Sequence, residues 1–297
     1  MIVDYIYFTL IASLIQQSLK PNKPPKLMKL RNILSAAALC TASVLALSSC
    51  SKQQETIAPA EEAISQSVLS KIKDMGLTTQ DIKKVDGGYL VEGDILITDE
   101  NLATKPEYQM LRVGTEEQYR TTNLVSVGSG RTVSIQVSVY LPSAYVTATD
   151  ELIRRYNAQS LLIRFVRVTS GGQIFLSKAP AGSTYLASAG FPSSGNAFNS
   201  VKVNSDAIGT ANASTYIATI LAHEVGHCIG FRHTDYAGRQ YSCGGAAVNE
   251  GAGTVGAIYI PGTPSGNDPN SWMLACIGSG ANRPFNTNDV TALRYVY

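Results

Sequence analysis

All three histidines of the chain lie within one stretch of eleven residues, at positions 223, 227 and 233. The first two are four positions apart, which on an α-helix places both imidazoles on one face, one turn apart. Apolar residues at Ile217, Ile220 and Leu221 precede them at helical spacing, so a helix is predicted from about Asn212–Ser214 through His223. Two imidazoles on such a helix can hold one metal ion, and this geometry is typical of zinc sites.

Gly230 predicts how the third histidine reaches the same ion. Glycine adopts the left-handed conformation that ends a helix, so the chain can turn back there and bring His233 beside His223 and His227. Three neutral imidazoles leave one position of a tetrahedral zinc ion open, as in catalytic rather than structural sites. Glu224 is then placed to act as a general base toward a water molecule. The sequence therefore predicts one catalytic Zn²⁺ with His223, His227 and His233 as ligands.

The segment HEVGHCIGFRH, residues 223–233, resembles the long zinc motif of the metzincin metallopeptidases and is especially similar to that of the bacterial HEIGH metallopeptidases. The resemblance extends over Arg131–Tyr297. It implies an α+β, metzincin-like catalytic domain, in which a twisted mixed sheet with packed helices, an active-site helix, a methionine turn and a C-terminal helix are expected. The turn is expected at Ser271–Cys276 with Met273 beneath the metal, and the helix at Phe285–Tyr297.

The resemblance also implies where a peptide substrate binds. Phe198–Asn204 is expected to be the exposed edge strand that aligns an extended peptide, with a rim loop at Ala187–Gly195. The stretch Cys243–Pro264 is expected to line a specificity pocket, or else to be an ordinary surface loop. Ala275 stands where several metzincins carry a tyrosine ligand, so a ligand from that turn is absent.

The residues that follow the third histidine leave several roles open. Asp235 is expected to fix the local turn or to orient an imidazole from outside the ligand set. Tyr236 and Tyr241 could approach the metal, although packing or surface roles are favoured for both.

Three functions are consistent with this site. The leading one, implied by the resemblance, is a zinc-dependent endopeptidase acting on peptide or protein substrates with Glu224 as general base. One alternative is a non-catalytic, zinc-stabilised binding or adhesion lipoprotein on the cell surface. Another is a hydrolase that uses the same zinc on a non-peptide amide or a glycan-linked peptide.

Hydrophobic patterning predicts the fold class of the C-terminal part independently of this motif. Apolar residues alternate from Val133 to Leu141, which is typical of a half-buried strand. Helix spacing follows at Thr149–Asn157, and further strands are predicted at Leu161–Val168 and Gln173–Leu176 before Phe198–Asn204. This order predicts helices packed on a sheet, an α+β fold.

The N-terminal region has the pattern of an export signal. Basic Lys29 and Arg31 precede an apolar stretch from Ile33 to Leu47 and then a lipobox-like Leu-Ser-Ser-Cys ending at Cys50. Cleavage before Cys50 would leave its thiol free for lipidation and anchor the protein to a membrane. A plain secretory signal or an uncleaved anchor is the alternative. The expected location is the bacterial cell envelope, at the outer membrane or cell surface, or the secreted fraction.

We accordingly divide the chain into four parts. Residues 1–27 are an upstream extension if Met28 is the true start, or the beginning of a longer leader, and residues 28–49 are the signal peptide. Residues 50–122 form a tether and a small N-terminal, propeptide-like domain, and residues 123–297 form the catalytic domain. Residues 50–297 carry 19 basic and 21 acidic side chains without a basic cluster, so no nucleic-acid partner is expected, and a monomer is the expected state.

The five cysteines fit an exported protein. Cys40 lies in the signal and Cys50 is the lipidation candidate. Cys228, Cys243 and Cys276 allow one disulfide in three possible pairings, with one thiol left over and expected to be buried.

The N-terminal domain is expected to contain a helix within Ala60–Met75 and a strand over Tyr89–Ile97 with Gly93 as a bulge. Residues 51–122 lack cysteine, so a thiol cannot block the zinc from this segment. Asp94 is a candidate to ligate the metal in its place.

Overall fold

The computed structural model describes residues 63–75, 77–103, 118–252 and 255–297. The expected signal peptide with Cys40 and the expected lipidation site at Cys50 lie outside the described residues. The described residues all belong to one structural unit, Glu61–Tyr297. No helix in this part of the chain is long and apolar enough to cross a membrane.

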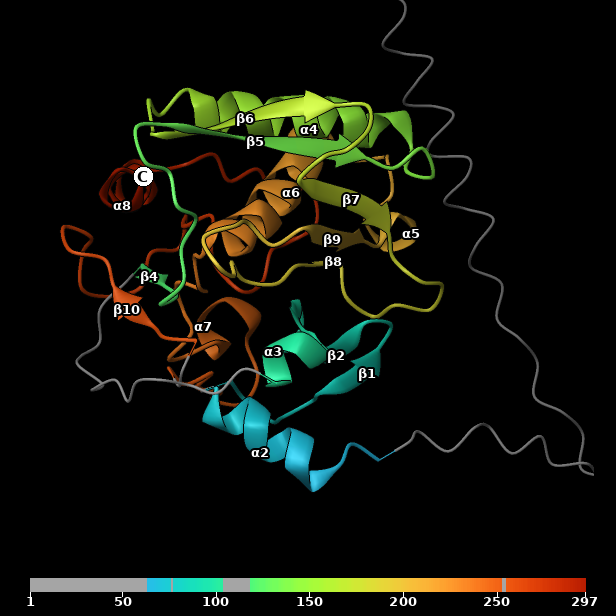
Figure 1. Cartoon of the computed structure of the whole chain (residues 1–297), viewed down its shortest axis with the longest axis vertical. Coiled ribbons are helices and arrows are strands. Elements are labelled where there is room, and N and C mark those ends of the chain that lie inside the picture. Colours follow the sequence, from blue (N-terminus) through green and yellow to red (C-terminus); the bar gives the residue numbers. More distant parts are fainter. Residues whose placement is uncertain (1–62, 76, 104–117, 253–254) are drawn as a thin grey trace, which may run out of the picture. The chain divides into compact units, whose positions relative to one another are not determined.

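Five strands form the main sheet, in the spatial order β6-β5-β7-β9-β8 (Figure 1). The first four run parallel, and the short β8 is antiparallel to its neighbour β9. Along β5 the side chains of Val133 and Ile135 are fully buried, whereas Thr132 before them is exposed and Ser134 between them is partly exposed, as the alternation predicted. The strands are β5 (Arg131–Val137), β6 (Ile163–Val168), β7 (Ile174–Lys178), β8 (Ala187–Ser188) and β9 (Ser200–Val203).

The predicted strand from Val133 to Leu141 is too long at its C-terminal end. The chain leaves β5 after Val137 and makes a turn. A hydrogen bond of ordinary length, 3.1 Å, from Leu141 N–H to Ser138 O closes this turn. Val139 and Tyr140 lie on this turn and are exposed, so the alternation there does not reflect burial.

Two long helices cover one face of the sheet. Helix α4 (Ser143–Asn157) connects β5 to β6 and packs on β6 and on α6 (Ser214–Ile229), which in turn contacts β8 and β9. Val166 of β6 and Phe175 of β7 are partly exposed on the opposite face. Every residue of α6 from Tyr216 onward is buried, because sheet, α4 and the C-terminal segments surround it. The helix that carries the histidines is therefore fixed by packing against these neighbouring elements.

The remaining elements of the C-terminal part lie below the sheet in Figure 1 or at its side. The C-terminal helix α8 (Thr287–Val296) starts with a capping box between Asn286 and Asp289, which confirms the predicted cap. The other elements are short: β4 (Tyr119–Arg120), β10 (Ile258–Tyr259), α5 (Ser205–Ile208) and α7 (Gln240–Cys243).

The N-terminal elements have their own small hydrophobic cluster, built around Ile72, Val91, Ile95 and Leu102. Three antiparallel strands form a separate sheet in the order β1-β2-β3. The elements are α2 (Gln66–Asp74), β1 (Lys83–Val85), β2 (Gly88–Val91), β3 (Ile95–Ile97) and α3 (Asp99–Ala103).

The expected single strand over Tyr89–Ile97 is wrong. The chain reverses at Glu92–Asp94 and pairs β2 with β3 as a hairpin. Glu92 and Gly93 both have positive φ angles, 55° and 92°, so Gly93 serves a tight turn rather than a bulge. The turn presents the side chain of Asp94 at the tip of the hairpin.

The expected edge strand is also wrong. β9, within the predicted Phe198–Asn204 strand, is internal, because β8 from the predicted rim loop pairs with its outer side. The edge of the main sheet is therefore β8 and the residue that follows it, Ala189. The N-terminal hairpin occupies this edge: Ala189 N–H donates to Asp94 O at 2.9 Å and Leu96 N–H donates to Ala189 O at 2.7 Å. Ile95 and Ala189 form a parallel bridge.

The fold class is as predicted: α+β, with a mixed sheet, packed helices, a histidine-bearing helix, a turn at Met273 and a C-terminal helix.

Candidate metal centre

Helix α6 carries His223 and His227 on one face, and both are buried. The helix ends at Gly230, which has φ 109° and ψ 14°, the left-handed conformation that the sequence predicted. A Cβ atom at Gly230 would lie 2.9 Å from the carbonyl oxygen of Asn123, so the position also excludes a side chain sterically. The reversed chain brings the fully buried His233 beside the other two imidazoles.

Each imidazole is oriented by an oxygen atom that faces its Nδ1. These oxygens are acceptors, so the Nδ1 atoms carry protons and the Nε2 atoms are the ones left to bind a metal. The three contacts are His223 Nδ1 to Trp272 O at 2.9 Å, His227 Nδ1 to Phe231 O at 2.8 Å, and His233 Nδ1 to Glu250 Oε1 at 2.8 Å.

The three Nε2 atoms converge with a carboxylate oxygen of Asp94, and these four atoms lie within 4.8 Å of one another. His223 Nε2 and His227 Nε2 are 3.1 Å apart, and Asp94 Oδ2 is 3.0 Å from His233 Nε2 and 3.6 Å from His223 Nε2. Ligand atoms that share one tetrahedral zinc ion are separated by about 3.3 Å, given bond lengths of about 2.0–2.1 Å. The set of donors therefore fits a zinc ion.

Charge within the site agrees with this fit. Burial, followed by repulsion from His223 and His233, lowers the pKa of His227 well below its usual value, which keeps this imidazole neutral as a ligand must be. Burial alone would lower the pKa of His233 as well, but Asp94 and Glu250 outweigh it and the net shift is upward. Burial alone would raise the pKa of Asp94, but its contacts with His233 and His223 outweigh it and the net shift is downward. Asp94 and Glu250 therefore place negative charge beside the imidazoles.

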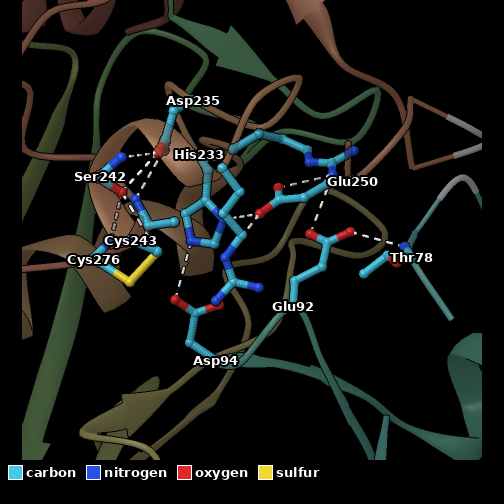
Figure 2. A network of polar contacts seen from close by, with 12 residues as sticks. Thr78, Glu92, Asp94, His233, Asp235, Ser242, Cys243, Glu250 and Cys276 are labelled. Carbon is cyan, nitrogen blue, oxygen red and sulfur yellow. Dashed lines mark hydrogen bonds and ion pairs between the residues drawn. A yellow bond between two sulfur atoms is a disulfide. The ribbon is translucent and has the colours of Figure 1, made fainter. Parts of the chain in front are cut away.

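Figure 2 shows a second group of charges, on the far side of His233 from Asp94. Arg232 is fully buried, and its Nη2 atom lies 3.3 Å from Glu92 Oε2 and 3.5 Å from Glu250 Oε2. Burial, then repulsion from Glu250, raises the pKa of Glu92 well above its usual value. The β2–β3 turn therefore contacts the site twice, with Asp94 at the imidazoles and Glu92 at Arg232.

Glu250 is the residue that orients His233, and sequence reasoning missed it. It lies 17 positions after His233 in a glycine-rich stretch, where no periodicity or motif distinguishes it. Asp235, which the sequence offered for this role, does not contact an imidazole. Its carboxylate instead accepts from Ser242 Oγ at 2.6 Å and from Ala275 N–H at 3.0 Å, and so joins two loops, the other role considered for it.

Glu224 is buried beside this cluster and lines a pocket of about 290 Å³. Its Oε2 atom is buried and has no hydrogen-bond partner among the described residues. Burial, then repulsion from Asp94, raises the pKa of Glu224 well above its usual value. A carboxylate in this position can accept a proton from a group that enters the pocket.

The pocket has different walls from those expected. Thr219 and Ile220 of α6 line it together with Leu274–Ile277 after the methionine turn. The other lining residues include Gly93 and Asp94 of the hairpin, Thr184–Ala187, Arg239 and Arg283. None of the described residues in Cys243–Pro264 lines this pocket. Cys276, the disulfide partner of Cys243, does line it. The predicted wall from that loop is therefore wrong for this pocket.

The methionine turn lies directly against α6, as expected. Met273 is fully buried, and a Cβ atom at Gly226 would lie 2.6 Å from Met273 Sδ and 2.6 Å from the ring of Trp272. Glycine at position 226 thus allows α6 to approach the turn whose carbonyl oxygen, at Trp272, orients His223.

The remaining candidates are placed away from the imidazoles. Tyr236 packs at 4.3 Å between ring centroids on Tyr119, and Tyr241 is 40% exposed, so both have the packing or surface roles that were favoured. The structure selects the Cys243–Cys276 disulfide from the three possible pairings. Cys228 is a buried free thiol on α6, which confirms the expected left-over cysteine.

Comparison with solved structures finds distant likenesses. Two structures of myroilysin match with 15% identity. The first match has a TM-score of 0.27 and covers 39% of this chain and 54% of the myroilysin chain. The second has a TM-score of 0.36 and covers 57% of this chain and 84% of the myroilysin chain. This chain thus spans about half the length of the first of them. High choriolytic enzyme 1, a hatching enzyme zinc-protease from the medaka fish Oryzias latipes, matches with 15% identity and a TM-score of 0.32, covering 58% of this chain and 91% of its own.

No curated protein matches the chain. The family model for the dual-action HEIGH metallo-peptidases matches residues 89–297, about 70% of the chain, and it includes the three histidines, Glu224, Met273 and the Asp94 hairpin. The chain is therefore a member of the HEIGH metallopeptidase family.

Proposed function

We propose that this metallopeptidase is a zinc-dependent endopeptidase with Glu224 as its general base. The observation that carries the proposal is the position of Glu224, which lines the pocket beside three converging imidazoles and whose buried Oε2 has no hydrogen-bond partner among the described residues. A structural zinc site has no need of such a carboxylate, because four protein ligands complete it.

The roles of the residues follow from their geometry. His223, His227 and His233 would hold the zinc ion, which when bound supplies a Lewis acid that makes water more acidic and polarises a carbonyl group. Glu224 accepts the proton of the attacking water and returns it to the amine of the leaving peptide. Burial raises the pKa of Glu224, which makes its carboxylate a stronger base than an exposed one. Trp272 O, Phe231 O and Glu250 keep the imidazoles in the ligand tautomer.

We also propose that the described structure is the latent form of the enzyme. The β2–β3 hairpin binds the edge of the sheet at Ala189 through two main-chain hydrogen bonds, as an extended peptide would. In the same position Asp94 places its carboxylate among the imidazoles and would occupy the zinc position that a water needs. Residues 51–122 then act as a propeptide that blocks the site until it is displaced or removed.

The cellular location is a further proposal, and two features of the sequence and fold support it. The signal pattern before Cys50 is that of a lipid-anchored envelope protein, and the Cys243–Cys276 disulfide is suited to an oxidising compartment. Labelling of cells with a radioactive fatty acid should mark the parent protein, whereas Cys50→Ala should abolish the label.

Glu224→Gln tests the catalytic role. With the N-terminal segment removed by limited proteolysis or displaced, the parent should cleave casein and Glu224→Gln should lose about 10²–10⁴-fold in kcat, the range for general-base catalysis. Both proteins should contain one zinc ion, measured by elemental analysis. If both contain zinc and neither cleaves casein or a panel of cell-wall peptides, the endopeptidase proposal is wrong and a binding function takes its place.

A further inference from the structure

The pocket beside Glu224 contains a positive charge that no step of the proposed reaction uses. Arg283 lines this pocket together with Glu224, His223 and several apolar side chains, among them Ile220, Leu274 and Ile277. No carboxylate of the described residues forms an ion pair with Arg283. The two acids that influence it electrostatically, Asp235 and Asp289, are already bound by other groups.

The fold holds Arg283 in place through two contacts. Its backbone N–H donates to Thr219 Oγ1 at 3.0 Å, on the turn of α6 that precedes His223. Its Nη1 donates to the carbonyl oxygen of Cys276 at 2.9 Å, next to the disulfide. A guanidinium group has five N–H donors, so most of them remain available to a ligand that enters the pocket.

The other arginine of the pocket differs in this respect. Arg239 also lines the pocket, but its Nε atom is 3.7 Å from Glu250 Oε1, so it has a carboxylate as an ion-pair partner. Arg283 is half-buried among apolar walls, and burial lowers its pKa, an effect that Asp235 and Asp289 oppose only in part. A half-buried cation that has no ion-pair partner among the described residues favours an anionic ligand.

We infer that Arg283 is a specificity-determining residue that binds a substrate carboxylate next to the scissile bond. This inference rests on the proposed peptidase function and extends it to a substrate class. The volume of the pocket suits one side chain, and planar guanidinium and carboxylate groups can form paired hydrogen bonds. The carboxylate can come from an Asp or Glu side chain flanking the bond or from the C-terminus of a short peptide.

Matched peptides distinguish the two sources. One set carries Asp, Glu, Asn, Gln, Leu or Lys on either side of the cleaved bond and an amidated C-terminus. The other carries only neutral side chains and ends one residue after the bond, either as a free acid or as an amide. The full chain would be assayed with zinc as parent and as Asp94→Ala, each with and without Arg283→Gln, which removes the charge and keeps an uncharged N–H donor.

We expect kcat/KM for peptides with the preferred carboxylate to exceed that of the isosteric amide by about 10- to 100-fold, as for a charge-assisted hydrogen bond in a partly buried site. Arg283→Gln should remove this ratio and leave cleavage of the Leu peptide within about threefold. Arg294→Gln, a change on the exposed side of α8, is the control. It should alter neither the carboxylate-to-amide ratio of kcat/KM nor the cleavage of the Leu peptide. Retained zinc and an unchanged melting temperature show that the variants are folded.

Two outcomes overturn the inference. The first is a parent enzyme that cleaves peptides without preferring a carboxylate over its amide isostere. The second is an Arg283→Gln protein that loses acidic and neutral substrates equally. If no peptide is cleaved even after limited proteolysis has removed the N-terminal segment, the peptidase proposal fails first. Calorimetry then measures the binding of an Asp peptide and of its Asn counterpart to the zinc-loaded protein, and so tests whether Arg283 binds a carboxylate. Equal binding of the two peptides by the parent overturns the inference.

Discussion

The latency proposal makes Asp94→Ala the most informative single change. The substitution removes the carboxylate that lies 3.0 Å from His233 Nε2 and 3.6 Å from His223 Nε2. It leaves the main-chain pairing of the hairpin with Ala189 and the Arg232–Glu92 contact in place. The hairpin should therefore stay folded while it loses its direct hold on the metal site.

The size of the effect follows from the contact that is removed. Asp94 contributes a charged group to the site, and a contact of a charged group in a partly buried position contributes about 1.5–3 kcal/mol. That range corresponds to about 10- to 150-fold in the equilibrium between the blocked and the open site. If the blocked form dominates in the parent, turnover by the uncleaved Asp94→Ala chain should rise by about this factor. Zinc should also pass more quickly to a chelator from the variant than from the parent, since one protein ligand is gone.

The assay compares full-length parent, Asp94→Ala and Asp86→Ala on a fluorogenic peptide, with zinc content and chain integrity checked before and after. Asp86 is an exposed carboxylate on the same hairpin sheet, in the turn between β1 and β2, and its removal should change nothing. An Asp94→Ala protein that holds zinc and remains within about twofold of the parent, both in turnover and in zinc release, would refute the reasoning.

Three further predictions test the framework of the site. Gly226→Ala forces a Cβ to within 2.6 Å of the Trp272 ring, which is packed too tightly to move, so we expect a loss of about 1–3 kcal/mol in unfolding free energy together with weaker zinc binding. Gly278→Ala, in open space, should be neutral in the same unfolding experiment. Cys276→Ala opens a loop of 33 residues and should cost about 4 kcal/mol, and reducing the parent should cost a similar amount in a denaturant titration. Burial raises the pKa of Asp289 from 3.8 to about 7, so the folded chain binds this proton more tightly than the unfolded chain. Stability from this group is present below pH 4 and is lost as pH rises to about 7. The difference in unfolding free energy between the parent and Asp289→Asn should therefore change over this range, and a constant difference would contradict it.

The zinc-binding segment was predictable because its geometry is local. His223 and His227 are fixed relative to each other by a single helical turn, and Gly230 brings His233 back within three residues. The alternation along β5 and the capping residues of α8 are likewise properties of short segments, and both predicted elements are present. The strand order was not predictable in this way. A two-residue strand, β8, takes the edge position from β9, and so short a segment has no periodicity to detect.

The contacts that give the site its function depend instead on residues far apart in the sequence. Asp94 is 139 positions from His233, and the hairpin that carries it was expected to be one strand, which would have placed this carboxylate elsewhere. Arg283 reaches the pocket only because Thr219 and Cys276 hold it from two other segments. The motif thus places the proposed zinc ligands and the proposed base, whereas the access of substrate to them depends on long-range packing. Because the hairpin and the pocket both border Glu224, a variant that frees the edge at Ala189 should show the carboxylate preference of Arg283 most clearly, and the two proposals can be tested in the same proteins.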